Sequence, residues 1–118
     1  MRAWRMAAMV AASFLLWGCA GSERPLTLKE YYGFCWPAQI DSGCWDDTLC
    51  DEYRDYLAQE HANKQECIKG CQELQNHKYM ADAARGCNGA VINATDWCET
   101  YCRRLFDYGT PGQEGAGQ

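Results

Sequence analysis

The sequence predicts an all-α fold, a small disulfide-stapled bundle of about three helices with an irregular N-terminal segment. Apolar residues recur at helical spacing in three segments after residue 45, and no strand-like alternation persists beyond a few residues. A domain of this size has only a modest hydrophobic core, so disulfides worth roughly 2–4 kcal/mol each would supply much of its stability. Eight cysteines lie within the predicted domain 31–109: Cys35, Cys44, Cys50, Cys67, Cys71, Cys87, Cys98 and Cys102.

The first part of the domain shows no regular pattern. Residues 26–44 contain Gly33, Pro37 and Gly43, which favour turns and loops, and this segment is expected to be irregular. A first helix is predicted to follow, capped by Asp46 or Asp47 and ending near residue 60. Its apolar face would consist of Leu49, Cys50, Tyr53, Tyr56 and Leu57.

A second helix is predicted to begin at a cap on Asn63 and to last to about Ala84, with Gly86 as its stop. Gly70 weakens its helical propensity locally. An alternative is that residues 61–63 do not interrupt the helix, so that the first and second helices are one. The apolar stripe would consist of Cys67, Ile68, Cys71, Leu74, Tyr79 and Ala81.

The third helix is the clearest amphipathic segment of the chain. Cys87–Ala90 is expected to form a turn, and Val91-Ile92 to act as a hydrophobic staple before a cap at Asn93 or Thr95. Gly109 would end the helix. Its apolar face would consist of Trp97, Cys98, Tyr101, Cys102, Leu105 and Phe106.

Two Cys-x3-Cys pairs, one on the second helix and one on the third, each place two sulfurs one helical turn apart. Such neighbours have Cβ atoms roughly 5–6 Å apart, whereas a disulfide needs about 3.5–4.5 Å. Neither pair should therefore close on itself. Antiparallel helices would link the pairs crosswise, Cys67 with Cys102 and Cys71 with Cys98. The third helix should then pack Trp97, Tyr101 and Leu105 against Ile68, Leu74 and the first helix.

This arrangement resembles the twin Cys-x3-Cys helical hairpin of the small mitochondrial intermembrane-space chaperones and the wider coiled-coil–helix class. Here 26 residues separate the two pairs, a longer interval than in that family, and four further cysteines have no counterpart. Only the hairpin geometry is therefore carried over. The partners of Cys35, Cys44, Cys50 and Cys87 are left open by the sequence.

The N-terminus has the order of a secretory signal. Basic residues within 1–5 precede 12 apolar or small residues, Met6–Trp17, a length typical of a signal peptide and too short to span a bilayer. The tetrapeptide Leu16-Trp17-Gly18-Cys19 resembles the lipobox of bacterial lipoproteins. That resemblance implies cleavage before Cys19 and acylation of its thiol and new amino group.

The implied organisation has four parts. Residues 1–18 would be the signal peptide, 19–30 the lipidated cysteine and its tether, 31–109 the helical domain and 110–118 a disordered tail. The protein would reside in the bacterial cell envelope, held in the membrane through acyl chains on Cys19. Ala20 after the cysteine resembles the address of lipoproteins in the outer membrane of Gram-negative bacteria, facing the periplasm.

Parity and charge agree with this organisation. Without Cys19, the nine cysteines become an even set of eight, which suits four disulfides in an oxidising compartment. Cleavage would leave nine Lys and Arg against 16 acidic residues, a net charge near −7. Such a charge argues against nucleic acid as a partner and against a polybasic contact with anionic lipid.

Other chemistries find less support. A thiol–disulfide factor would carry two residues between its cysteines inside a strand–helix–strand unit, and here there are three and no such unit. A metal site could be drawn from His61, Cys67, Cys71 and His77, but His77 would point away from the cysteines and oxidised cysteines cannot bind metal as thiolates. A calcium loop starting at Asp41 fails, because its sixth position is not glycine. No cofactor, metal or catalytic residue is therefore expected.

Aromatic residues are the remaining candidates for recognition. Tyr31, Tyr32 and Trp36 lie in the segment expected to be irregular and are the candidate partner contacts, because aromatic anchors are enriched at binding sites. The sequence thus favours a non-enzymatic envelope lipoprotein that binds or scaffolds another envelope protein. Recognition of a small ligand or glycan through exposed aromatics, or a role as a periplasmic thiol–disulfide factor, are the alternatives.

Overall fold

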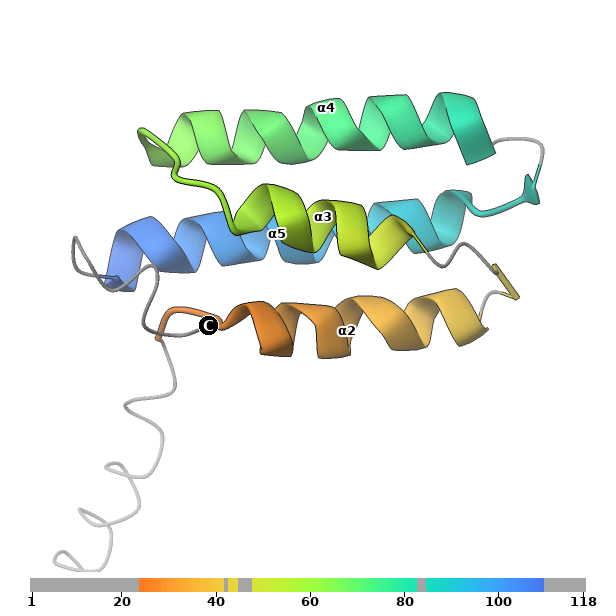
Figure 1. Cartoon of the computed structure of the whole chain (residues 1–118), viewed down its shortest axis with the longest axis horizontal. Coiled ribbons are helices and arrows are strands. Elements are labelled where there is room, and N and C mark those ends of the chain that lie inside the picture. Colours follow the sequence, from red (N-terminus) through yellow and green to blue (C-terminus); the bar gives the residue numbers. More distant parts are fainter. Residues whose placement is uncertain (1–23, 42, 45–47, 83–84, 110–118) are drawn as a thin grey trace, which may run out of the picture.

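The computed structural model describes residues 24–41, 43–44, 48–82 and 85–109, and these residues form four helices and no strand. The helices are α2 (Leu28–Asp41), α3 (Leu49–Leu57), α4 (Lys64–Asp82) and α5 (Asn88–Tyr108). Helix α5 packs against the other three (Figure 1). The predicted class, an all-α bundle held by disulfides, is confirmed.

The N-terminal segment is a helix, and its prediction as irregular was wrong. Thr27 and Glu30 form a reciprocal capping box, in which Thr27 Oγ1 accepts from the Glu30 amide (3.1 Å) and Glu30 Oε1 from the Thr27 amide (3.2 Å). Pro37 lies inside α2 and removes the hydrogen bond to the Gly33 carbonyl, but both residues are exposed, so water can satisfy that carbonyl. Leu26 and Leu28 are also buried, so the packed domain begins before Tyr31.

Helices α3 and α4 are separate, which settles the alternative of one long helix. The Asn63 side chain accepts a hydrogen bond from the Glu66 amide at 2.9 Å, as the predicted N-cap should. The predicted caps Asp46 and Asp47 lie outside the described residues. The apolar face of α3 is confirmed: Leu49, Cys50, Tyr53 and Leu57 are buried and Tyr56 is half-buried.

The stripe of α4 is correct except at its C-terminal end. Cys67 and Cys71 are fully buried, whereas Ala81 is exposed. One turn before Ala81, Lys78 is buried instead, and its ammonium lies 2.8 Å from Glu52 of α3. A long side chain with a charged tip can cover apolar surface in this way, which a hydrophobicity pattern does not register.

Helix α5 begins at Asn88, more than one turn earlier than predicted, and ends at Gly109 as expected. The prediction of a turn at Cys87–Ala90 was wrong, because Cys87 is the N-cap and residues 88–90 are helical, and Val91-Ile92 lies inside the helix rather than before it. The predicted caps serve other purposes, because Thr95 Oγ1 donates to the Val91 carbonyl and the Asn93 amide donates to the Phe34 carbonyl. Burial of Ala90, Val91 and Ala94 stabilises this additional helix.

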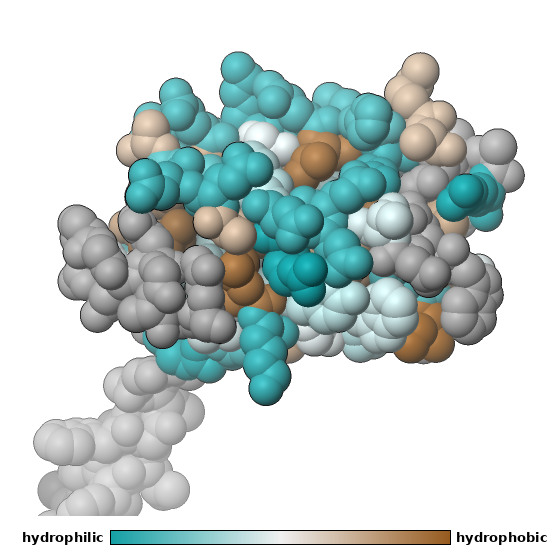
Figure 2. All heavy atoms as spheres, viewed as in Figure 1, coloured by the Kyte–Doolittle hydropathy of each residue, from teal (hydrophilic) through white to brown (hydrophobic). Residues whose placement is uncertain are grey.

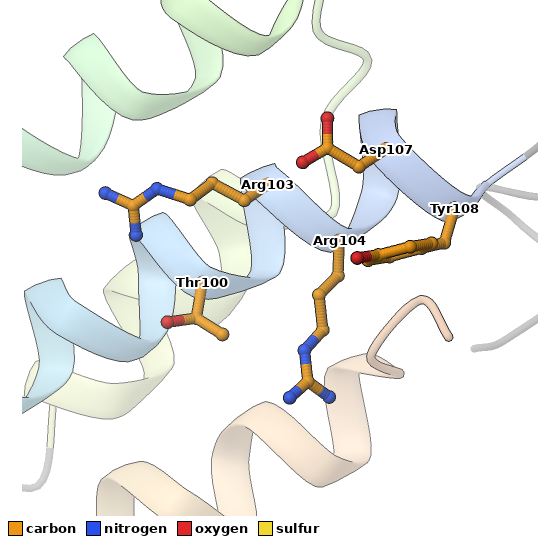
Figure 3. Close-up of a pocket in the computed structure, with 5 residues that line it drawn as sticks. All are labelled: Thr100, Arg103, Arg104, Asp107 and Tyr108. Atoms are coloured by element: carbon orange, nitrogen blue, oxygen red, sulfur yellow. The ribbon is translucent and has the colours of Figure 1, made fainter. Parts of the chain in front are cut away.

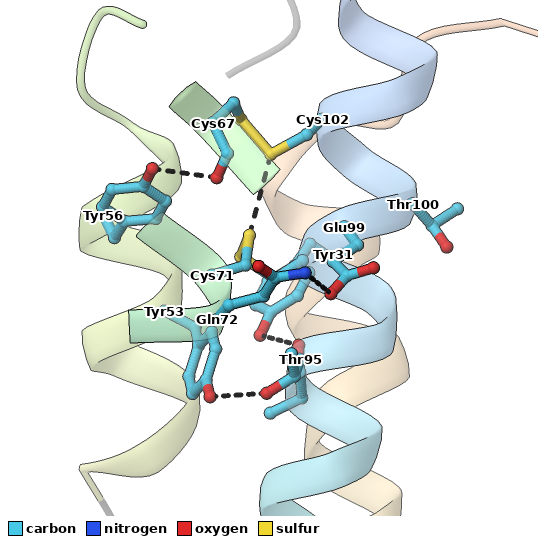
Figure 4. Close-up of a disulfide and its surroundings, with 12 residues drawn as sticks. Tyr31, Tyr53, Tyr56, Cys67, Cys71, Gln72, Thr95, Glu99, Thr100 and Cys102 are labelled. Atoms are coloured by element: carbon cyan, nitrogen blue, oxygen red, sulfur yellow. Dashed lines mark hydrogen bonds between the residues drawn. A yellow bond between two sulfur atoms is a disulfide. The ribbon is translucent and has the colours of Figure 1, made fainter. Parts of the chain in front are cut away.

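Four disulfides link the helices. The crossed pairing between α4 and α5 is confirmed, Cys67 with Cys102 and Cys71 with Cys98, at Cα–Cα distances of 5.7 and 5.9 Å. The two bonds are neighbours, since Cys71 Sγ lies 3.7 Å from Cys102 Sγ (Figure 4). The partners that the sequence left open are Cys35 with Cys50 and Cys44 with Cys87.

Helix α5 also contacts the other helices through buried hydroxyl groups. The Tyr31 hydroxyl of α2 donates to the Ala94 carbonyl at 3.0 Å. The Tyr53 hydroxyl of α3 lies 2.7 Å from Thr95 Oγ1 (Figure 4). Both tyrosine side chains are fully buried. These bonds satisfy polar groups whose burial would otherwise be costly.

Candidate functional site

The three aromatic residues proposed for partner contact do not form one exposed surface. Tyr31 is fully buried and hydrogen-bonded in the core, so it cannot contact a partner, and its inclusion was wrong. The helical conformation of α2 explains this, because it places Tyr31 on the same face as Leu28 and Cys35. Burial also raises the pKa of the Tyr31 hydroxyl far above its ordinary value, with a smaller contribution from Tyr53.

Tyr32 and Trp36 lie at the border between α2 and α3 and are both half-buried. Their rings stack with centroids 6.0 Å apart, and the Arg54 guanidinium of α3 lies 5.0 Å from the Tyr32 ring centre. A cation–π contact of this kind stabilises the packing of α2 on α3. Part of each ring is therefore committed to the fold and part remains at the surface.

A second aromatic pair lies on the other side of α2, and the sequence did not single it out. Phe34 of α2 stacks on Trp97 of α5 with ring centroids 4.1 Å apart, and Phe34 is 40 % exposed. Trp97 thus faces α2, whereas the sequence predicted that it would pack against α4 and α3. The sequence did not reveal this pair because residues 28–41 were not predicted to be a helix. Only in a helix does Phe34 lie beside the buried stripe of this segment.

Near the C-terminal end of α5, a depression of about 240 Å³ opens on the surface. It is lined by Thr100, Arg103, Arg104, Asp107 and Tyr108 (Figure 3).

Two of its charged side chains are paired. Arg103 lies 2.8 Å from Glu99, and Asp107 lies 2.8 Å from Lys64 of α4. Arg104 extends toward α2 and forms no ion pair or hydrogen bond with any residue in the described part of the chain (Figure 3). An arginine in this situation can bind an anionic group by charge and by hydrogen bonds.

Outside these positions the visible surface is largely hydrophilic. Figure 2 shows apolar residues as separate areas among polar ones rather than as one broad patch. Scattered apolar side chains are normal for a soluble surface. Recognition by this face would thus depend on individual aromatic and charged side chains.

The cysteines are arranged for structure. All eight in 31–109 are disulfide-bonded and at most 4 % exposed. Within the described residues, no group of three or more His, Cys, Asp or Glu side chains is placed to hold a metal ion. His61 lies instead against the Tyr56 ring, with centroids 4.8 Å apart, and its Nε2 is buried without a hydrogen-bond partner among these residues.

A carboxyl group with a strongly lowered pKa belongs to a helix cap. Arg24 pairs with both carboxylate oxygens of Glu30, at 2.7 and 2.6 Å. This pair, with the hydrogen bond from the Thr27 amide, lowers the pKa of Glu30 to about 2. The carboxylate is at the N-terminus of α2, where negative charge is favoured, and it has a structural role there.

The predicted lipidation site Cys19 and the lipobox lie outside the described residues. Among the residues that are described, no helix is both long enough and apolar enough to cross a membrane. Comparison with protein families, with curated proteins and with solved structures found no match to this chain.

Proposed function

We propose that this chain is a lipid-anchored protein of the bacterial cell envelope with a non-enzymatic role, in which it binds or scaffolds another envelope protein. The anchor rests on the resemblance of residues 16–19 to a lipobox. The binding role rests on one structural observation: four disulfides hold a small helical scaffold whose partly exposed aromatic rings are fixed in place. Rigid aromatic side chains lose little conformational freedom on binding and are favourable contact residues.

The anchor is tested by Cys19→Ser expressed in a bacterial host. We expect the variant to lose the acyl mass seen on the wild-type protein and to leave the membrane fraction. Cys19 is the only cysteine of the lipobox, so a variant that still incorporates labelled fatty acid would contradict the assignment.

The binding role is tested by photo-crosslinking in intact envelopes. A photoreactive phenylalanine analogue at Phe34 should yield one defined adduct with another envelope protein. The same analogue at Lys69, whose side chain is 74 % exposed on α4, is the control and should yield none. Equal adducts at both positions, or none at either, would argue against a partner at the α2–α5 border.

Recognition of a glycan or another small ligand is the second candidate, and the stacked pair Phe34–Trp97 favours it. An aromatic ring at a surface can stack on the apolar face of a sugar ring. Titration of the protein with envelope glycan fragments should then change the fluorescence of Trp97, and Trp97→Phe should remove that change. A thiol–disulfide activity is less favoured because the cysteines are buried.

A further inference from the structure

We infer that the end of the bundle formed by the start of α2 and the end of α5 faces the membrane that holds the anchor, and that Arg104 contacts the phosphate of its phospholipid headgroups. This inference rests on the proposed acylation of Cys19. It adds to that proposal an orientation and a lipid-contacting residue.

The length of the tether carries the first step. Five residue steps separate Cys19 from Arg24, the first described residue, and even a fully extended chain of this length spans at most about 18 Å. The start of α2 must therefore lie close to the bilayer surface. Because α2 and α5 are antiparallel, the end of α5 lies at the same end of the bundle (Figure 1).

The charge distribution favours one orientation of the bundle on the membrane. The tether alone would also allow the bundle to lie on its side. Acidic residues outnumber basic ones at the far end: Asp41 and Asp82 are the last residues of α2 and α4, and Asp51 and Glu52 lie in the first turn of α3, against Lys78 and Arg85. An anionic surface repels this end.

The end near the tether is different. Five of the nine Lys and Arg residues in 24–109 lie close to it: Arg24, Lys29, Lys64, Arg103 and Arg104. Their acidic neighbours make this end close to neutral rather than polybasic. The net charge of the chain therefore opposes general adsorption to anionic lipid while its distribution favours one orientation.

Arg104 is the residue at this end that is best placed to contact a phosphate. It lies about one helical turn from the end of α5, in the depression shared with Thr100 and Tyr108. Arg24, Lys64 and Arg103 each pair with a carboxylate, whereas Arg104 and Lys29 have no acidic partner among the described residues, and of these two only Arg104 lines the depression. A phosphate would supply the missing anion, and Tyr108, which is 45 % exposed, would lie at the headgroup level that aromatic residues prefer.

Hydrogen–deuterium exchange on the acylated protein tests the contact. The protein is compared in a non-ionic detergent and in vesicles of phosphatidylcholine with phosphatidylglycerol. We expect amides of residues 103–108 to exchange more slowly in vesicles, while those at the far end, in residues 78–82, do not change. In Arg104→Gln this slowing of exchange should be about fivefold smaller than in the wild type. That factor is equivalent to about 1 kcal/mol, the contribution of one basic side chain near an anionic surface.

Two matched variants separate the contact from general effects. Lys69→Gln also removes one positive charge, from an exposed site on α4, and should leave the protection unchanged. Arg104→Lys keeps the charge and should retain most of the protection, which also controls for folding. Equal exchange in detergent and vesicles, or equal effects of the two Gln variants, would overturn the inference.

The remaining outcomes are also distinguishable. Absence of an acyl mass on Cys19 would contradict the proposed anchor itself and remove the tether argument. An acylated protein protected at 103–108 in native envelopes but not in lipid vesicles would show that a protein, not lipid, covers Arg104, and would overturn the lipid contact alone.

Discussion

Tyr31 and Tyr53 connect α2 and α3 to the central helix α5 through their hydroxyl groups. Each ring is fully buried, and each hydroxyl has a partner on α5, the Ala94 carbonyl or the Thr95 hydroxyl. Burial, partly offset by the hydrogen bond with Thr95, raises the pKa of Tyr53 to about 12. The neutral phenol is thus the form that the fold stabilises.

We expect the free energy of unfolding to fall at alkaline pH. The pKa of Tyr53 is higher in the folded protein than in the unfolded chain, where it is about 10, so the contribution is complete below pH 10 and is lost as pH rises from about 10 to about 12. Urea titrations at successive pH values, with tyrosinate absorbance, would measure this. Tyr53→Phe should show a shallower decline. If every tyrosine ionised near pH 10 while the helices stayed intact, the burial of both hydroxyls would be refuted.

At the scale of elements, close contact between α3 and α4 explains why Gly70 lies in the middle of α4, although glycine is a poor helix former. The Tyr56 hydroxyl donates to the carbonyls of Glu66 and Cys67, at 3.2 and 2.9 Å, and its ring lies directly over Gly70. A Cβ at residue 70 would overlap the Tyr56 hydroxyl and the ring carbon that carries it. The cost in helical propensity is offset by this approach of the two helices.

Gly70→Ala should therefore destabilise the protein by about 1–2 kcal/mol, although alanine is the better helix former by about 1 kcal/mol. The displaced tyrosine would lose both hydrogen bonds. In a Tyr56→Leu background the same substitution should be neutral or stabilising, which is the control. Denaturant unfolding of the four proteins gives the coupling directly, and additive effects would mean that Tyr56 does not impose the glycine.

The crossed disulfides make α4 and α5 one structural unit. Removing the bond between Cys71 and Cys98 by the double substitution to alanine should cost about 1–2 kcal/mol, less than for an isolated disulfide, because Cys67–Cys102 still closes the enclosing loop and limits the freedom that the unfolded chain regains. The neighbouring Cys67–Cys102 bond should keep the helices antiparallel and the circular dichroism spectrum helical. Peptide mapping would verify that bond. A double variant as stable as the wild type would show that the two disulfides are redundant.

In the molecule as a whole, the cysteines of the domain are buried between the helices. Reagents can therefore reach them only when the helices separate. All eight in the domain are at most 4 % exposed, and they connect every helix to at least one other. Reduction should therefore require opening of the fold.

We expect no thiol to react with an alkylating reagent when the acylated protein is denatured without reductant. In native buffer, reduction by dithiothreitol should be slow, and mild urea should accelerate it, with loss of helical circular dichroism. Two or more free thiols per chain in fresh material would instead support a redox or metal-binding role.

Local pattern was sufficient for much of this fold. The helical spacing of apolar residues identified α3, α4 and α5, and the end of α5 at Gly109 was correct. The Cys-x3-Cys spacing excluded closure within a pair, and the crossed pairing followed once the two helices were assumed to be antiparallel neighbours, as they are. These are short-range constraints that act within one or two elements.

Contacts between distant residues account for the rest. Segment 28–41 contains Gly33 and Pro37, yet it is helical because a capping box starts it and burial of Tyr31 and Cys35 on α5 and α3 holds it. The same contacts bury Tyr31, pair Phe34 with Trp97 and set the partners of Cys44 and Cys87 across 43 residues. Local propensity is a weak preference, and the free energy of tertiary packing overrides it wherever enough apolar surface is buried.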